Sequence, residues 1–144
     1  AFDRVTGLEA FLRTAYKPYG FLTDAQWRRL TETSTRRLPD GRVTPHYDPA
    51  IVQQFTHHPD DYLLWSHYDA LAVPVLLLRG AESDLVLRDT AERMTTRGPG
   101  ARGQLRWIEV AGCGHAPALN VPAQLDVVSN FIGRAERSAN AIAA

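Results

Sequence analysis

The stretch VPVLLLRGAESDLVL, residues 73–87, sets the expectation for the fold. The segment from Val73 to Leu78 is a nearly continuous aliphatic run without polar alternation, which is typical of a parallel strand covered on both faces. A strand of that kind needs helices above and below it, because its apolar side chains point to both faces of the sheet. The polar loop after the run carries Asp84. These residues indicate an α/β fold with an acidic group beyond the end of one strand.

A second stretch repeats this order of strand and polar loop. The segment from Leu105 to Val110 is expected to form a strand, and the loop VAGCGHAPAL, residues 110–119, then carries His115. A helix is expected at about residues 88–96, between the two strands. The 26 residues from 79 to 104 therefore suffice for a crossover that joins two parallel neighbours.

Asp84 and His115 are candidates for paired chemistry, because open parallel sheets react at the carboxyl ends of their strands. The two residues are 31 positions apart in the sequence but would lie at the same end of the sheet, where both strands finish. A buried carboxylate that accepts a hydrogen bond from the Nδ1–H group of His115 would fix its tautomer, stabilise the imidazolium and leave Nε2 free as a general base. Gly112 and Gly114 suit the tight turn of such a loop. The alternative is that Asp84 is a capping residue and His115 a solvated turn residue.

The first 70 residues show helical periodicity interrupted by turns, and the period changes after residue 70. Apolar spacing and capping residues predict helices in four places: Val5 to Ala15, a helix capped by Thr23 that ends near Ser34, Pro49 to Thr56 after an Asp48 cap, and Asp60 to Ala70. A turn is expected at residues 37–43, and a helix stop at 97–103. A last helix should run from Pro122 to about Ala135, followed by a tail from Ser138 that frays.

Composition narrows the class of protein. The chain has 144 residues, 44% of them hydrophobic, which suits one domain. Sixteen basic and sixteen acidic residues leave no net charge, which argues against nucleic acid or an anionic membrane as the partner. The single cysteine, Cys113, cannot form an internal disulfide, so a cytoplasmic setting is the default expectation. The chain starts with Ala1 rather than Met, which suggests trimming or a fragment, and no apolar run approaches about 20 residues.

Three segments carry a resemblance to a known family: LWSHYDAL at 64–71, PVLLLRGAESDLV at 74–86 and GCGHAPAL at 112–119. Together they resemble the C-terminal half of an α/β-hydrolase of the bacterial type with a helical cap. The resemblance covers essentially the whole chain. It implies a helical cap or lid for residues 1–70, and the last two strands with their helices, an incomplete core, for residues 71–144.

The resemblance also implies roles for single residues. Asp84 matches the acid of the catalytic triad and His115 matches its base. Two positions depart from the family pattern: Asn120 stands where a glutamate is often found, and Leu87 stands where a serine or threonine would cap the next helix. The resemblance implies no metal and no organic cofactor.

The third triad member is absent from the sequence. Members of the family carry a serine nucleophile in a Gly-x-Ser-x-Gly elbow, and these 144 residues contain no such motif. Cys113 lies between two glycines only two residues before His115, so its thiol would have to turn back onto a near neighbour, and we disfavour it as the nucleophile. The family pattern places the serine, the oxyanion-hole amides and the central strands upstream.

Two strands alone would leave one edge of the sheet with unpaired amides and carbonyls. We therefore expect a missing N-terminal half, or a second copy of the chain, along that edge. The expected function is a fragment of a serine hydrolase for a small-to-medium ester, lactone or related acyl substrate, inactive in isolation. The alternative is a non-catalytic module that binds a partner through the open edge.

No metal site is expected, because the adjacent residues His57 and His58 point in different directions on a helix. The aromatic side chains could line a substrate pocket, although at helical spacing they more often form core: Phe11, Phe21, Trp27, Tyr62 and Trp65.

Overall fold

The computed structural model describes the backbone of residues 1–142 and the side chains of residues 1–134. The chain forms two compact units. The first unit comprises Ala1–Lys17 and Phe21–Leu64, and the second comprises Pro18–Gly20 and Trp65–Ala144. The first unit falls within the segment that the sequence predicts to be a cap, and its role as a cap stays a prediction.

Two helices dominate the first unit, α1 (Val5–Ala15) and α2 (Asp24–Thr33), and the short η1 (Lys17–Tyr19) follows α1. The predicted apolar stripe of α1 is confirmed, because its Leu8 and Leu12 are fully buried. The predicted cap of α2 is confirmed as well. The Thr23 hydroxyl accepts a hydrogen bond from the Gln26 amide at 3.3 Å, and the Gln26 side chain accepts one from the Thr23 amide at 2.8 Å.

A hairpin completes the core of the first unit. Strands β1 (Thr35–Arg37) and β2 (Val43–Pro45) pair antiparallel around the predicted turn, although the sequence did not predict the strands themselves. Phe2 adds a bridge on the other side of Val43: its amide donates to the Val43 carbonyl at 2.7 Å, and the Val43 amide donates back at 2.8 Å. The side chain of Val43 packs into one cluster with those of Leu8 and Leu12.

Two helix predictions after the hairpin are wrong in their bounds. The expected helix at 49–56 is a 3-10 helix, η2 (Pro49–Gln53), followed by one turn of α3 (Gln54–His57), although Asp48 caps the Ala50 amide at 2.9 Å as predicted. The expected helix from Asp60 is divided into η3 (Pro59–Tyr62) and α4 (Trp65–Ala70). Leu63, between them, is 72% exposed, and short helices need tertiary packing to persist.

The second unit contains the predicted strand pair. Strands β3 (Val75–Gly80) and β4 (Leu105–Val110) are parallel neighbours, with Val75 opposite Leu105 and Gly80 opposite Val110. The α/β fold with two parallel strands is thereby confirmed. Strand β3 starts two residues later than expected and extends to Gly80. Pro74, which has no amide hydrogen, precedes its first residue.

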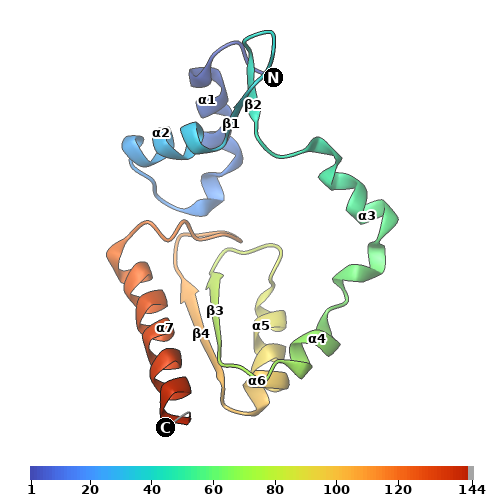
Figure 1. The fold of residues 1–144 in the computed structure, drawn as a ribbon, viewed down its shortest axis with the longest axis vertical. Helices are drawn as coiled ribbons and strands as arrows, with labels where there is room; N and C mark the ends of the chain where they lie inside the picture. The colour runs from blue at the N-terminus through green and yellow to red at the C-terminus, as the bar shows by residue number, and fades with distance from the viewer. Residues whose placement is uncertain (143–144) are drawn as a thin grey trace. The chain divides into compact units, whose positions relative to one another are not determined.

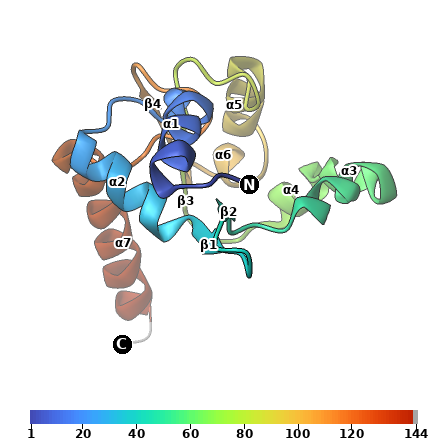
Figure 2. The ribbon, with the colours of Figure 1, turned by 90° about the horizontal axis from the view of Figure 1, so that it is seen from above.

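Helices flank this pair on both sides. Figures 1 and 2 show α7 (Pro122–Ile142) on one side of the strands, and α5 (Arg88–Thr95) and α6 (Gly98–Ala101) on the other. Helix α6 was not predicted: it forms in the glycine-rich segment where only a helix stop was expected. Helix α7 continues beyond the expected end near Ala135, and the last two residues of the predicted fraying tail lie outside the described residues.

The sheet of the second unit has only two strands among the described residues, so each strand has one unpaired edge. In the part of the chain that the structure describes, β3 pairs with β4 and with no other strand. Large apolar side chains on the loop after β3 and on α7 remain half or more exposed: Leu85 at 68%, Leu87 at 54%, Leu125 at 50% and Ile132 at 51%. A parallel α/β sheet normally has several strands with both faces covered by helices, and the apolar faces of those helices are buried against it.

Candidate active site

Asp84 lies in the loop that joins β3 to α5. The loop closes on itself, because the Ser83 amide donates to the Gly80 carbonyl at 3.0 Å and the Ser83 hydroxyl accepts from the Val86 amide at 3.1 Å. Ser83 is only 6% exposed, whereas Asp84, the next residue, is exposed. Ser83 is therefore held on the inner side of the loop, and the carboxylate of Asp84 is exposed to solvent.

His115 lies in the loop that joins β4 to α7, between two backbone anchors. The Gly114 amide donates to the Pro18 carbonyl at 2.6 Å, and the Ala118 amide donates to the Tyr19 carbonyl at 3.1 Å. Gly112 adopts a φ of 67°, in the left-handed region that glycine tolerates best, as the expected tight turn requires. The imidazole is exposed between the two anchors.

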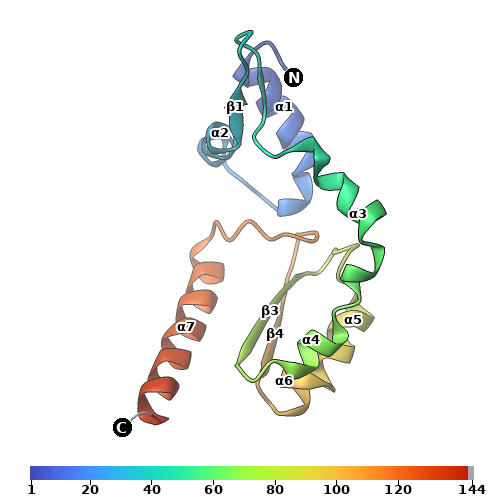
Figure 3. The same cartoon turned by 45° about the vertical axis from the view of Figure 1, so that its right-hand side comes forward.

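The two loops contact each other at the same edge of the sheet, where both strands end (Figure 3). The Glu82 amide donates to the Cys113 carbonyl at 2.9 Å. Gly80 permits this approach, because a Cβ atom at that position would lie 1.7 Å from the carbonyl oxygen of Gly114. The parallel register and one glycine thus bring the Asp84 loop and the His115 loop together.

The candidate side chains themselves are not joined, and the expectation of a buried carboxylate is wrong, because Asp84 lies at the solvent-exposed surface of its loop. Among the described residues, no hydrogen bond or ion pair connects Asp84 to His115, and both side chains are exposed. The structure brings together the loops that carry them, and the assignment of triad acid and triad base stays a prediction.

Cys113 has the wrong chemistry for an alternative nucleophile. Its side chain is 5% exposed, and burial raises the pKa of the thiol, with the negative charge of Glu82 acting in the same direction. A thiol with a raised pKa remains protonated near neutral pH and is a poor nucleophile. Gly20 packs directly against it, because a Cβ atom at Gly20 would lie 2.7 Å from the sulfur. These contacts indicate a packing role for Cys113.

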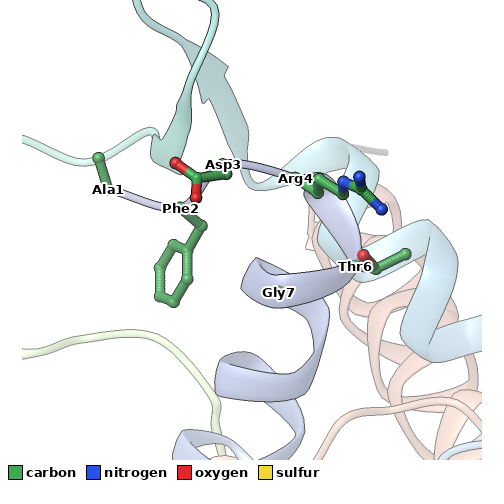
Figure 4. Close-up of a pocket in the computed structure, with 6 residues that line it drawn as sticks. All are labelled: Ala1, Phe2, Asp3, Arg4, Thr6 and Gly7. Atoms are coloured by element: carbon green, nitrogen blue, oxygen red, sulfur yellow. The ribbon is translucent and has the colours of Figure 1, made fainter.

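Other kinds of site are weakly supported. Among the described residues, no three His, Cys, Asp or Glu side chains gather as they would around a metal ion. None of the helices in the described residues is both long and apolar enough to cross a membrane. Figure 4 shows a pocket at the start of α1 in the first unit, and it contains neither Asp84 nor His115. Its lining residues are Ala1, Phe2, Asp3, Arg4, Thr6 and Gly7.

The aromatic residues divide between core and surface roles. Trp27 is buried in the first unit at 7% exposure, which fits the core interpretation. Trp65 stacks against two guanidinium groups in the second unit, with Arg93 and Arg97 each 4.5 Å from its ring centroid. This cluster ties α4 to α5 and to the segment that starts α6.

Two features of the site were not found from the sequence. No role in the site is predicted for Pro18–Gly20, yet the carbonyls of Pro18 and Tyr19 anchor the His115 loop. Arg79 is predicted to lie just after the strand, in the connection to the next one, yet it belongs to β3, is 6% exposed and binds the loop that carries Asp84. An arginine directly after an aliphatic run is a usable signal, because a buried guanidinium needs several acceptors nearby.

Comparisons with known proteins agree with this architecture. The chain matches no established family profile. It is 34% identical over 131 residues to the 3-hydroxybutyrate-oligomer hydrolase of Cupriavidus necator, and the match covers 85% of this chain and 43% of that protein.

Solved structures give the same picture. A hydrolase from Rickettsia typhi superposes with a TM-score of 0.76 at 21% identity, covering 92% of this chain and 44% of that one. An α/β hydrolase from Novosphingobium aromaticivorans superposes with a TM-score of 0.74 at 27% identity, covering 92% and 47%. The chain thus spans less than half the length of these relatives. The fold and these matches together show that the chain has part of the α/β-hydrolase fold, consistent with the C-terminal part of such a protein.

Proposed function

We propose that this chain supplies the acid, Asp84, and the base, His115, of a serine-hydrolase triad whose nucleophile lies outside these 144 residues. The observation that carries the proposal is the 2.9 Å hydrogen bond from the Glu82 amide to the Cys113 carbonyl. Each candidate follows one end of that bond by two residues. The match to a hydrolase at 34% identity supports the same class of reaction.

The proposed chemistry is acyl transfer by general base catalysis. Asp84 accepts a hydrogen bond from the Nδ1–H group of His115, and Nε2 takes the proton from the serine hydroxyl as its oxygen attacks the ester carbonyl carbon, which leaves an imidazolium that the Asp84 carboxylate stabilises. The tetrahedral intermediate then expels the alcohol, which receives that proton from Nε2. Water releases the acid from the acyl enzyme in a second round of the same steps.

Pairing of Asp84 with His115 requires a side-chain rearrangement from the state described above. Both side chains are exposed, so their rotamers are free to change at little cost. The loops that carry them are already bonded through their backbones. We therefore propose that the pair closes when the rest of the active site, including the nucleophile, packs against these loops.

The proposed substrate is a short-chain ester of a hydroxy acid. Oligomers of 3-hydroxybutyrate, for which the matched relative is named, join hydroxyl and carboxyl groups of short acids through ester bonds. The reaction needs no metal and no organic cofactor, because a triad supplies both proton transfer and nucleophile. Lactones and related acyl compounds present the same carbonyl chemistry and belong to the same proposal.

The test uses the protein encoded by the complete reading frame that contains these residues. Hydrolysis of p-nitrophenyl butyrate and of 3-hydroxybutyrate dimer should fall about 10⁶-fold in kcat for His115→Ala and about 10⁴-fold for Asp84→Asn. The matched control is His67→Ala, an exposed histidine on α4, which should retain full activity. Activity of His115→Ala equal to that of the control would contradict the proposal.

The 144-residue chain alone should not hydrolyse either ester above its His115→Ala variant. We also propose that the preceding half of the fold covers the open edge of β3, which in the described chain has no second neighbour. The isolated chain should then self-associate on size exclusion with light scattering. A well-folded, strictly monomeric species would count against this, and a start codon directly before Ala1 would favour the alternative, a non-catalytic module that binds a partner along the same edge.

A further inference from the structure

We infer that Arg79 is a positioning residue that fixes the Asp84 loop for catalysis, an inference that rests on the proposed function. Arg79 is the penultimate residue of β3 and is only 6% exposed. A guanidinium buried to this extent must have its hydrogen bonds satisfied by the protein. Its partners therefore show what the side chain does.

Those partners are the backbone of the Asp84 loop. The Arg79 guanidinium donates from all three of its nitrogen atoms to carbonyl oxygens of that loop: Nε to Val86 at 2.7 Å, Nη1 to Ala81 at 3.2 Å and Nη2 to Ser83 at 3.3 Å. Two of these carbonyls belong to residues on opposite sides of Asp84 in the sequence. The Arg79 side chain therefore binds the loop on both sides of Asp84. The ammonium of a lysine could not do this, because its donors radiate from a single nitrogen.

A carboxylate on the neighbouring strand neutralises this cation. Glu109 stands opposite Arg79 in the β3–β4 register, and its Oε1 atom lies 2.8 Å from Nη1. Its second oxygen accepts a hydrogen bond from Arg88 at 3.1 Å. The ion pair of Arg79 with Glu109 consequently ties the Asp84 loop to β4, the strand that leads to His115.

The experiment uses Arg79→Lys in the protein from the complete reading frame. Lysine keeps a positive charge near Glu109 but releases most of the loop carbonyls. We expect kcat to fall about 10²-fold, because a small misplacement of a catalytic group costs that much, while KM stays within about threefold. Loss of the aligned Asp84 carboxylate should also move the acid limb of the pH profile of kcat/KM to lower pH, since that carboxylate favours the imidazolium form. A merely structural role would reduce the active fraction without moving this limb.

Other titratable groups lie on the segments around His115: Tyr19, Glu82 and Cys113, all unchanged in this variant. The matched control is Arg88→Gln, which removes the other partner of Glu109 but no loop contact, and should leave activity and pH profile unchanged. Ser83→Ala serves as a second variant should Arg79→Lys fail to fold, because it removes the Ser83 hydroxyl that accepts from the Val86 amide. It should shift the limb in the same direction by a smaller amount.

Amide hydrogen exchange in a peptide spanning residues 81–87 gives a readout that does not depend on activity. Arg79→Lys should speed this exchange about tenfold or more, while Arg88→Gln should not. Unchanged exchange in Arg79→Lys would overturn the inference whatever the activity, and so would an active variant with an unmoved acid limb. A complete protein that hydrolyses no ester, yet shows faster exchange in Arg79→Lys, would contradict the proposed function and retain Arg79 as the anchor of the loop.

Discussion

The amide of Glu82 donates a 2.9 Å hydrogen bond to the carbonyl oxygen of Cys113, which joins the loops after two adjacent parallel strands. Each loop has an anchor of its own as well, Arg79 for the first and the Pro18–Gly20 segment for the second. The backbone around both candidate side chains is therefore held in place, while the side chains remain exposed. A fixed backbone with exposed side chains fits the proposal that the active site is completed when another part of the fold packs against these loops.

Gly80 should be the least replaceable residue of the site. A Cβ atom there would meet the carbonyl oxygens of Gly114 at 1.7 Å and Cys113 at 2.5 Å, so Gly80→Ala must push the two loops apart. We expect a loss of about 3 kcal/mol or more in the free energy of unfolding, measured by urea denaturation. Gly7→Ala is the control: it lies in α1, its Cβ atom would have ordinary contacts at 3.6 Å, and it should gain up to about 1 kcal/mol. Equal effects of the two substitutions would contradict the close approach of the loops.

Helix α5 should be stabilised by a better cap at Leu87. This residue occupies the N-cap position with extended backbone angles, φ −65° and ψ 158°, and its apolar side chain cannot accept a hydrogen bond. Leu87→Ser should be about 1 kcal/mol more stable than Leu87→Ala in chemical denaturation, because both lose the leucine but only serine caps the helix. Equal stabilities of the two variants would show that the first turn of α5 does not need the cap.

The pair of Asp69 with Arg97 should make stability depend on pH in acid. Arg97 binds both carboxylate oxygens of Asp69, and this hydrogen bonding holds the pKa of Asp69 below its usual range. A group with a depressed folded-state pKa contributes stability above its unfolded value, about 3.9, and loses it as pH falls through the folded value. Thermal melts from pH 7 to 2 should therefore show wild type and Asp69→Asn converging in acid. Arg97→Gln should abolish the same part of the pH dependence, and parallel curves for wild type and Asp69→Asn would contradict it.

The thiol of Cys113 should react slowly. Because burial raises its pKa, alkylation by iodoacetamide at pH 8 should be at least about tenfold slower in the folded protein than in 6 M guanidinium. The midpoint of the rate against pH should lie above that of the unfolded chain. Rapid labelling with a midpoint below pH 7 would instead support Cys113 as a nucleophile. Mass spectrometry of the labelled protein measures both quantities.

Local signals in the sequence were sufficient for several elements. The aliphatic run before Asp84 predicted β3 because continuous burial leaves no room for polar alternation, and the caps at Thr23 and Asp48 formed as their side chains allow. Two helix predictions failed where packing decides: the helix expected from Pro49 to Thr56 is a 3-10 helix followed by one turn of α3. The helix expected from Asp60 breaks at Leu63, since little tertiary packing holds that segment.

The sequence by itself determined the α/β class, the two parallel strands and the positions of Asp84 and His115 at their ends, because strand periodicity and loop placement depend on neighbouring residues. Only the tertiary structure decided what holds those loops. Three contacts hold them: Arg79 with the Asp84 loop, Gly80 with Gly114, and Pro18 with Gly114. The last two join segments that are distant along the chain, and the first requires the chain to turn back on itself. Such contacts depend on how the whole backbone folds, and the local periodicity of the sequence does not predict them.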